Sequence, residues 1–131
     1  RKLKLMIKRK QLPEKFICLP VPLHRKRRAW RGFNQAELLA RKVCGEMGLV
    51  FKKSYLKRVK NTTSQVKQSG KQQRELNMRD AFMIKKSTRI SAQNVIVIDD
   101  VVTTGATMSE IAKVLKNHGV KKVYGLVMSR G

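Results

Sequence analysis

The spacing of apolar residues changes along the chain, and each change marks a predicted element. The run KFICLPVPL (residues 15–23) is apolar and is stopped by two prolines, as expected of a buried strand that enters a loop. From Asn34 the apolar residues recur at helical spacing, Asn34 and Glu37 have the spacing of a capping box, and Gly48 ends the predicted helix. The apolar face of this helix is predicted to consist of Ala36, Leu39, Ala40, Val43 and Met47.

A second strand and helix are predicted in the last third of the chain. The segment NVIVIDD (residues 94–100) is apolar on both faces, as in a central strand of a parallel sheet. In the helix that follows, Thr107 and Glu110 have capping-box spacing and Gly119 provides the stop. Residues 123–129 are predicted to form a last strand. The apolar face of this second helix is predicted to consist of Ile111, Val114, Leu115 and His118.

The middle of the chain has weaker patterns. Short strands are predicted at residues 54–59 and 81–84. The intervening segment is polar and has no apolar face, so we expect a long flexible loop at about residues 60–80. A structureless segment of that length within a compact domain is usually a functional flap or a disordered region.

Strands that alternate with helices predict an α/β fold, with a parallel twisted sheet flanked by helices. At 131 residues the chain is long enough for one core, so we expect one domain at residues 16–131, preceded by a basic N-terminal segment at residues 1–15. Sheets of this kind bind ligands at the carboxyl ends of their strands. The segment DDVVTTG, residues 99–105, is predicted to lie there.

Charge narrows the class of partner. The chain has 31 Lys and Arg residues against 8 Asp and Glu, a net charge of +23, which favours polyanions such as nucleic acid, nucleotide phosphates or an anionic membrane face. An alternative is the general basic charge of ribosome-associated proteins. No stretch is apolar for long enough to span a bilayer and no signal segment opens the chain, so a cytoplasmic protein is expected. Cys18 and Cys44 lack the paired spacing of a zinc site and are predicted to be small core residues.

Two adjacent acids in so basic a chain call for an explanation. Asp99 and Asp100 follow the buried strand directly, and neighbouring carboxylates can accept hydrogen bonds from the cis hydroxyls of a ribose. A helix start comes next, where free backbone N–H groups and the helix dipole favour a phosphate. The residues predicted to hold that phosphate are Thr103, Thr104, Gly105, Ala106 and Thr107. The alternative is that the acids pair with Lys or Arg and the threonines only form a turn.

Residues 95–107, VIVIDDVVTTGAT, resemble the phosphoribosyl pyrophosphate (PRPP) signature of the type I phosphoribosyltransferases at every position. The resemblance implies a type I phosphoribosyltransferase-like fold. It also implies that Asp99 and Asp100 hold the ribose hydroxyls, that residues 103–107 hold the 5-phosphate, and that magnesium accompanies the pyrophosphate.

A second stretch resembles the ComF family of competence proteins. Its mark is a V-P segment, a basic loop and then RGFNQA, residues 31–36 in this sequence. Similarity to the flexible region of that family continues through Arg58, Thr62, Gln65, Arg74, Asn77, Ala81 and Phe82. The family usually begins with a cysteine-rich zinc-binding segment, which this chain lacks, so no zinc site is expected in it. The resemblance implies a role in natural competence, in which the protein handles incoming single-stranded DNA together with other competence proteins, with peripheral association with the inner face of the membrane.

Basic and aromatic residues are interleaved near the expected PRPP site. The residues predicted to meet either a pyrophosphate or a DNA backbone are Arg25, Lys26, Arg27, Arg28 and Arg31. Further candidate DNA contacts are Trp30, Lys60, Lys67, Lys71 and Arg74. Trp30 equally fits a place in the core, and Phe33 fits a contact at the helix entry.

Two other functions fit the same residues. The first is a working transferase that moves the phosphoribosyl group from PRPP to a base or an amine, although no segment clearly supplies a base-specific hood. The second is a regulator that senses PRPP and binds duplex DNA, although no recognition-helix pattern stands out. The motif therefore predicts a ligand site and leaves turnover open.

Overall fold

β1 (Ile17–Pro20) lies inside a four-stranded sheet of order β2-β1-β5-β6, in which every neighbouring pair is parallel. The other strands are β2 (Val50–Phe51), β5 (Asn94–Val102) and β6 (Lys122–Arg130). This computed structural model describes residues 16–24, 29, 32–60, 79–86, 88–90, 94–102 and 105–130. The predicted segments at residues 1–15 and 61–78 lie outside this part of the chain.

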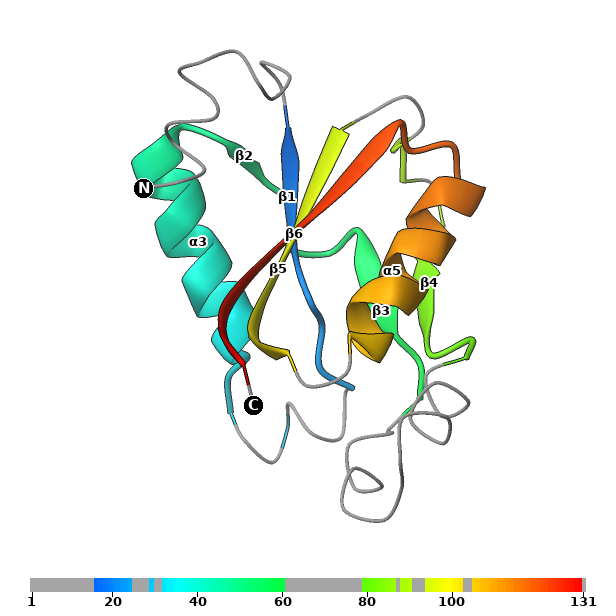
Figure 1. The fold of residues 1–131 in the computed structure, drawn as a ribbon, viewed down its shortest axis with the longest axis horizontal. Coiled ribbons are helices and arrows are strands. Elements are labelled where there is room, and N and C mark those ends of the chain that lie inside the picture. Colours follow the sequence, from blue (N-terminus) through cyan, green and yellow to red (C-terminus); the bar gives the residue numbers. More distant parts are fainter. Residues whose placement is uncertain are drawn as a thin grey trace.

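The helices cover opposite faces of the sheet (Figure 1). α3 (Gln35–Met47) connects β1 to β2 on one face, and α5 (Ala106–Asn117) connects β5 to β6 on the other. The two short predicted strands also form, as an antiparallel pair of β3 (Leu56–Arg58) and β4 (Phe82–Ile84) on the α5 side. The predicted parallel sheet flanked by helices is therefore confirmed.

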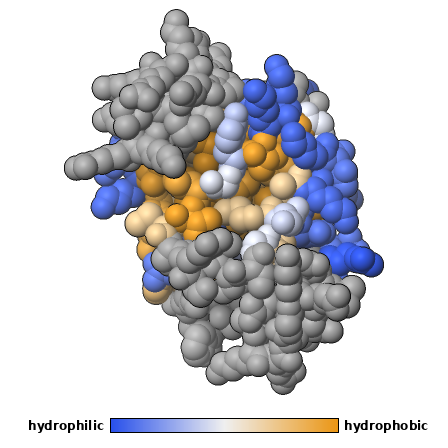
Figure 2. Space-filling view, in the orientation of Figure 1, coloured by the Kyte–Doolittle hydropathy of each residue, from blue (hydrophilic) through white to orange (hydrophobic). Residues whose placement is uncertain are grey.

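Each face of the sheet has its own apolar core because β5 is buried on both sides. Val95 and Val97 pack in the cluster that contains α5 and the β3–β4 pair, whereas Ile96 and Ile98 pack in the cluster beneath α3. In the view of Figure 2, apolar side chains gather in the middle and hydrophilic ones line the side on which α5 lies. No helix in the described ranges is long and apolar enough to cross a membrane.

The two cysteines are core residues, as predicted. Cys18 of β1 and Cys44 of α3 are free, buried, and members of the same cluster beneath α3. A hydrogen bond to Cys44 and burial both raise the pKa of the Cys18 thiol. Both residues therefore contribute to packing as small apolar side chains.

The ends of α3 agree with the sequence pattern. The side-chain oxygen of Asn34 accepts the N–H of Ala36 at 3.0 Å, and its Nδ2 donates to the carbonyl of Val21 at 3.0 Å. Gly48 ends the helix with a φ of 68°, and its N–H donates to Cys44. Asn34 thus caps α3 and ties the helix to the segment that leaves β1.

α5 differs from the prediction at both ends. Its N-cap is Gly105 and it has no side-chain cap, so the predicted capping box at Thr107 and Glu110 is wrong. Instead, Oε1 of Glu110 accepts the backbone N–H of Asp80 at 3.0 Å, so the carboxylate ties α5 to the segment before β4. His118 is exposed at the C-cap and does not share the apolar face, because the helix ends there before turning at Gly119, whose φ is 84°.

Candidate functional site

The two acids lie at the point where the strand order of the sheet reverses. From β1 the chain proceeds through α3 to a strand on one side, and from β5 it proceeds through α5 to a strand on the other side. The crevice between the carboxyl ends of two such strands is the usual ligand site of an open parallel sheet. β1 ends at Pro20 opposite Ile98, so β5 continues past its neighbour with Asp99 and Asp100.

The acid pair shares hydrogen bonds and has limited contact with water. Both residues are half-buried, and the Asp99 carboxylate accepts the backbone N–H of Asp100 at 2.9 Å. Burial raises the pKa of Asp99 to about 7, with further upward contributions from a side-chain hydrogen bond and the charge of Asp100. At neutral pH Asp99 therefore lies near the point of gaining or losing a proton.

Arg58 belongs to this site, although the sequence reasoning assigned it no role there. It lies on β3 and is only 7% exposed, with its guanidinium carbon 5.2 Å from the centroid of the Phe82 ring. Its positive charge lowers the pKa of Asp99 and partly opposes the effect of burial. The sequence contained a signal, since Arg58 occupies the same face of β3 as the apolar Leu56. In so short a strand, however, an inward-facing cation is easily interpreted as surface charge.

The expected phosphate loop leads directly into α5. Gly105 has a φ of 81°, a left-handed value that favours glycine, and its carbonyl accepts the N–H of Ser109 at 2.9 Å as the helix begins. Ala106 is buried and Thr107 is half-buried. The N-terminus of a helix of twelve residues therefore follows the acid pair. Thr103 and Thr104 lie outside the described residues.

Most of the predicted basic contacts lie outside the part of the chain that the structure describes. Lys60 is the exception: it is exposed, and its Nζ donates to the carbonyl of Arg79 at 2.6 Å, so its role in DNA binding stays a prediction. The residues outside the described ranges are Arg25, Lys26, Arg27, Arg28, Trp30, Arg31, Lys67, Lys71 and Arg74.

A sheet of this order, with an acid pair at its switch point and a glycine-led helix start beside it, defines a phosphoribosyltransferase-like domain. The family model for the phosphoribosyl transferase domain matches residues 29–128, and the chain belongs to that family. Among solved structures, it resembles an adenine phosphoribosyltransferase with a TM-score of 0.60 and 14% identity, over 99% of this chain and 65% of that one. It also resembles a hypoxanthine phosphoribosyltransferase from Staphylococcus aureus with a TM-score of 0.59 and 11% identity, over 100% of this chain and 70% of that one.

Sequence relatives specify the branch of the family. The chain is 38% identical to Competence protein F of Haemophilus influenzae over 114 residues, 86% of this chain and 48% of that protein. It is 35% identical to Competence protein ComFC of Bacillus subtilis, over 84% of this chain and 42% of that protein. It is 32% identical to DNA utilization protein YhgH of Escherichia coli strain K12, over 86% of this chain and 48% of that protein. The resemblance to the ComF family is confirmed, and the chain spans about half the length of these relatives.

Proposed function

We propose that this domain binds PRPP with the ribose against Asp99 and Asp100 and the 5-phosphate at the start of α5. The observation that carries the proposal is the half-buried acid pair at the switch point of the sheet, directly before the helix start at Gly105. In a protein of net charge +23, this pair selects for hydroxyl donors within a field that attracts phosphates.

In this proposal each part of the site has a different task. A deprotonated carboxylate accepts charge-assisted hydrogen bonds from the two ribose hydroxyls, and Arg58 favours that ionised form of Asp99. The positive end of the α5 dipole favours the phosphate. Magnesium bound with the pyrophosphate would neutralise part of its charge. Carboxylate oxygens are ligands that this cation accepts, so the acid pair is compatible with it.

We further propose a ComF-type role in natural competence, in which the domain binds and handles incoming single-stranded DNA. Support comes from the relatives named as competence and DNA utilization proteins, and from the net charge of +23. The partners would be single-stranded DNA and other competence proteins, in the cytoplasm or at the inner face of the membrane. Because binding to a DNA backbone releases counterions, affinity should fall steeply with salt.

One observation favours the second function, phosphoribosyl transfer from PRPP to a base or an amine. The family model of the phosphoribosyl transferase domain matches residues 29–128, and the transfer would need a general base for the proton of the attacking nitrogen. In that reaction the new bond forms at the ribose C1 and pyrophosphate leaves. Release of pyrophosphate is therefore the measurement that separates the two functions.

The test is a calorimetric titration of the protein with PRPP and magnesium, with and without a single-stranded oligonucleotide, while pyrophosphate release is followed in parallel. Binding of both ligands without release supports the DNA-handling role. Release above the spontaneous background, stimulated by one member of a panel of bases and amines, supports the transferase. Absence of PRPP binding contradicts the proposed site in either role.

Gly105 provides a prediction with a matched control. Gly105 and Gly119 have φ values of 81° and 84° at opposite ends of α5, so replacing either with Ala should destabilise the fold by roughly 1 kcal/mol. Only Gly105→Ala should also weaken binding of ribose 5-phosphate, roughly tenfold, because it shifts N–H groups that meet a charged phosphate. Titration with ribose 5-phosphate and thermal unfolding of both variants measure the two effects. Equal binding by both would place the phosphate away from the start of α5.

A further inference from the structure

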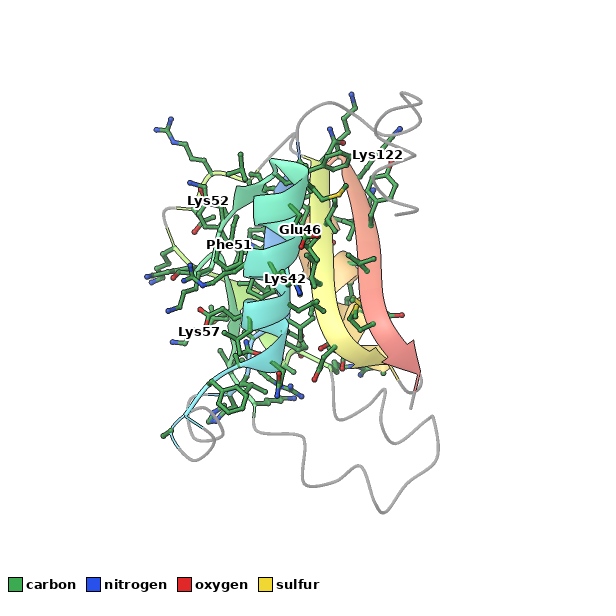
Figure 3. The ribbon with its side chains drawn as sticks, turned by 90° about the vertical axis from the view of Figure 1, so that its left-hand side faces the viewer. Lys42, Glu46, Phe51, Lys52, Lys57 and Lys122 are labelled. Atoms are coloured by element: carbon green, nitrogen blue, oxygen red, sulfur yellow. The ribbon has the colours of Figure 1, made fainter. Side chains whose placement is uncertain are left out.

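Cations and aromatic rings gather where α3, β2 and the start of β3 meet. Residues 41–60 contain seven Lys and Arg residues and one acid, Glu46. Figure 3 shows Lys52, Phe51 and Lys57 along one side of the molecule, away from β5 and β6. The members of this cationic face are Arg41, Phe51, Lys52, Lys53, Tyr55 and Lys57.

Two rings on this face carry a cation above them. The guanidinium carbon of Arg41 lies 4.8 Å from the centroid of the Phe51 ring, and Nζ of Lys52 lies 5.7 Å from that of Tyr55. Both rings are half-buried: Phe51 packs against the core beneath α3 and Tyr55 against the core on the α5 side, so the cationic face extends around the β2 edge of the sheet. The core thus fixes the position of each ring and leaves part of it at the surface, where a guanidinium plane or a ring can stack on an unpaired base.

A buried acid holds two of the cations in place. Oε1 of Glu37 lies 3.2 Å from Nζ of Lys53 and 3.9 Å from the Arg41 guanidinium. The Glu37 side chain is 8% exposed, whereas those of Arg41 and Lys53 are 56% and 49% exposed. The buried Glu37 carboxylate therefore restrains both cations, while their side chains remain exposed to solvent. Ordering them in advance reduces the entropy lost when they bind an anion.

We propose that the cationic face binds single-stranded nucleic acid, with phosphates on the Lys and Arg side chains and bases on Phe51, Tyr55 and Arg41. This inference rests on the proposed DNA role and deepens it, since it assigns the contact to residues other than the predicted basic residues at 25–31. Alternating cations and rings suit an unpaired strand, whose bases are free to stack. A duplex would offer only its phosphates to the same side chains.

β3 connects this face to the PRPP site. Lys57 is exposed on the outer side of the strand opposite Met83, while the next residue, Arg58, is buried and acts on Asp99. Consecutive strand residues point to opposite faces, so the two sites share a strand without sharing a side chain. Substitutions confined to the cationic face should therefore leave PRPP binding unchanged.

The experiment measures fluorescence anisotropy of a labelled 20-nucleotide oligo-dT between 50 and 300 mM NaCl. For the pair of substitutions Lys52→Gln and Lys57→Gln, we expect binding at 150 mM salt to weaken roughly tenfold and the salt slope to fall by about 1.4. The control pair is Lys113→Gln and Lys121→Gln, which makes the same change of charge on the α5 side. It should leave the slope nearly unchanged.

The rings are tested separately from the charges. Tyr55→Leu should weaken oligo-dT binding roughly tenfold through loss of a stacked base, whereas Tyr55→Phe should retain it. Thermal unfolding and calorimetry with PRPP accompany each variant, so that a loss of fold is distinguished from a loss of contact. A Tyr55→Leu protein that is folded and binds oligo-dT as tightly as wild type overturns the stacking role.

Each remaining outcome also decides a specific point. If both lysine pairs weaken oligo-dT binding equally, only overall charge matters and the cationic face is overturned. If neither pair weakens oligo-dT binding, the cationic face is overturned as well. Tighter binding to a 20-base-pair duplex, or to phosphatidylglycerol vesicles, overturns the assignment to a single strand. If the wild-type protein binds PRPP but not oligo-dT, the cationic face and the DNA role are both overturned. If it binds oligo-dT but not PRPP, only the PRPP site is overturned.

Discussion

Changing Asp99 and Asp100 together to Asn is expected to weaken PRPP binding at least about 100-fold while the domain stays folded. Each carboxylate that accepts a ribose hydroxyl contributes a charge-assisted hydrogen bond, worth about 1.5 to 3 kcal/mol, and an amide oxygen accepts less strongly. Asn has nearly the same shape as Asp and both sites are half-buried, so packing should survive. Calorimetry measures the binding, and circular dichroism with thermal unfolding measures the fold.

The matched control addresses overall charge. Changing Glu46→Gln and Asp80→Asn, two exposed acids outside the pair, removes the same number of negative charges. If charge alone governed the affinity for a polyanionic ligand, both double variants would bind PRPP more tightly than wild type. Retained PRPP binding by the Asp99 and Asp100 variant would remove the proposed ribose site.

Asp99→Asn alone is expected to stabilise the protein at pH 8 by on the order of 1 to 3 kcal/mol and to make little difference at pH 4. The pKa of Asp99 in the folded protein is about 7, above its ordinary value of 3.8. Between these values the folded state holds a proton that the unfolded state releases. The contribution of protonated Asp99 to the free energy of unfolding is thus complete below about pH 4 and is lost as the pH rises through 7. An amide never acquires the half-buried charge, so the advantage of the variant grows across this range.

Chemical unfolding of wild type and variant at several pH values measures this difference. Asp80→Asn is the control, because Asp80 is exposed and its φ of 58° suits Asn equally well. Arg58→Met should raise the pKa of Asp99 further, which carbon-detected NMR of the carboxyl can follow in the absence of any ligand. A constant difference between Asp99→Asn and wild type from pH 5 to 8 would contradict the raised pKa.

The strong elements of the fold could be predicted because their signals are local. β5 is apolar on both faces, α3 is bounded by Asn34 and Gly48, and each of these features depends on residues close together in sequence. The capping box at Thr107 and Glu110 was wrong because a pattern of two residues does not show where a helix begins. The left-handed backbone at Gly105 sets the start of α5, and the Glu110 carboxylate instead contacts Asp80.

The site was predicted only in part, for a related reason. Asp99, Asp100 and the start of α5 lie together in sequence, so their order alone indicated a ligand site. Arg58 reaches Asp99 from another strand across about forty residues of sequence, and only the packing of β3 and β4 against the sheet brings it there. The cationic face likewise depends on contacts of Glu37 and Arg41 in α3 with residues that follow the helix.

The seam between β1 and β5 has a consequence for folding kinetics. Its strands are joined by only four register pairs, from Ile17 with Val95 to Pro20 with Ile98, although they are far apart in the sequence. β5, α5 and β6 are consecutive, so we expect this unit to form early through local contacts and closure of β1 onto β5 to be a late and slow step. The proposed ligand crevice lies at the end of this seam and would be complete only after closure. A ligand that contacts both sides should therefore slow amide exchange across the whole β1–β5 ladder, with far less effect on the ladder between β5 and β6.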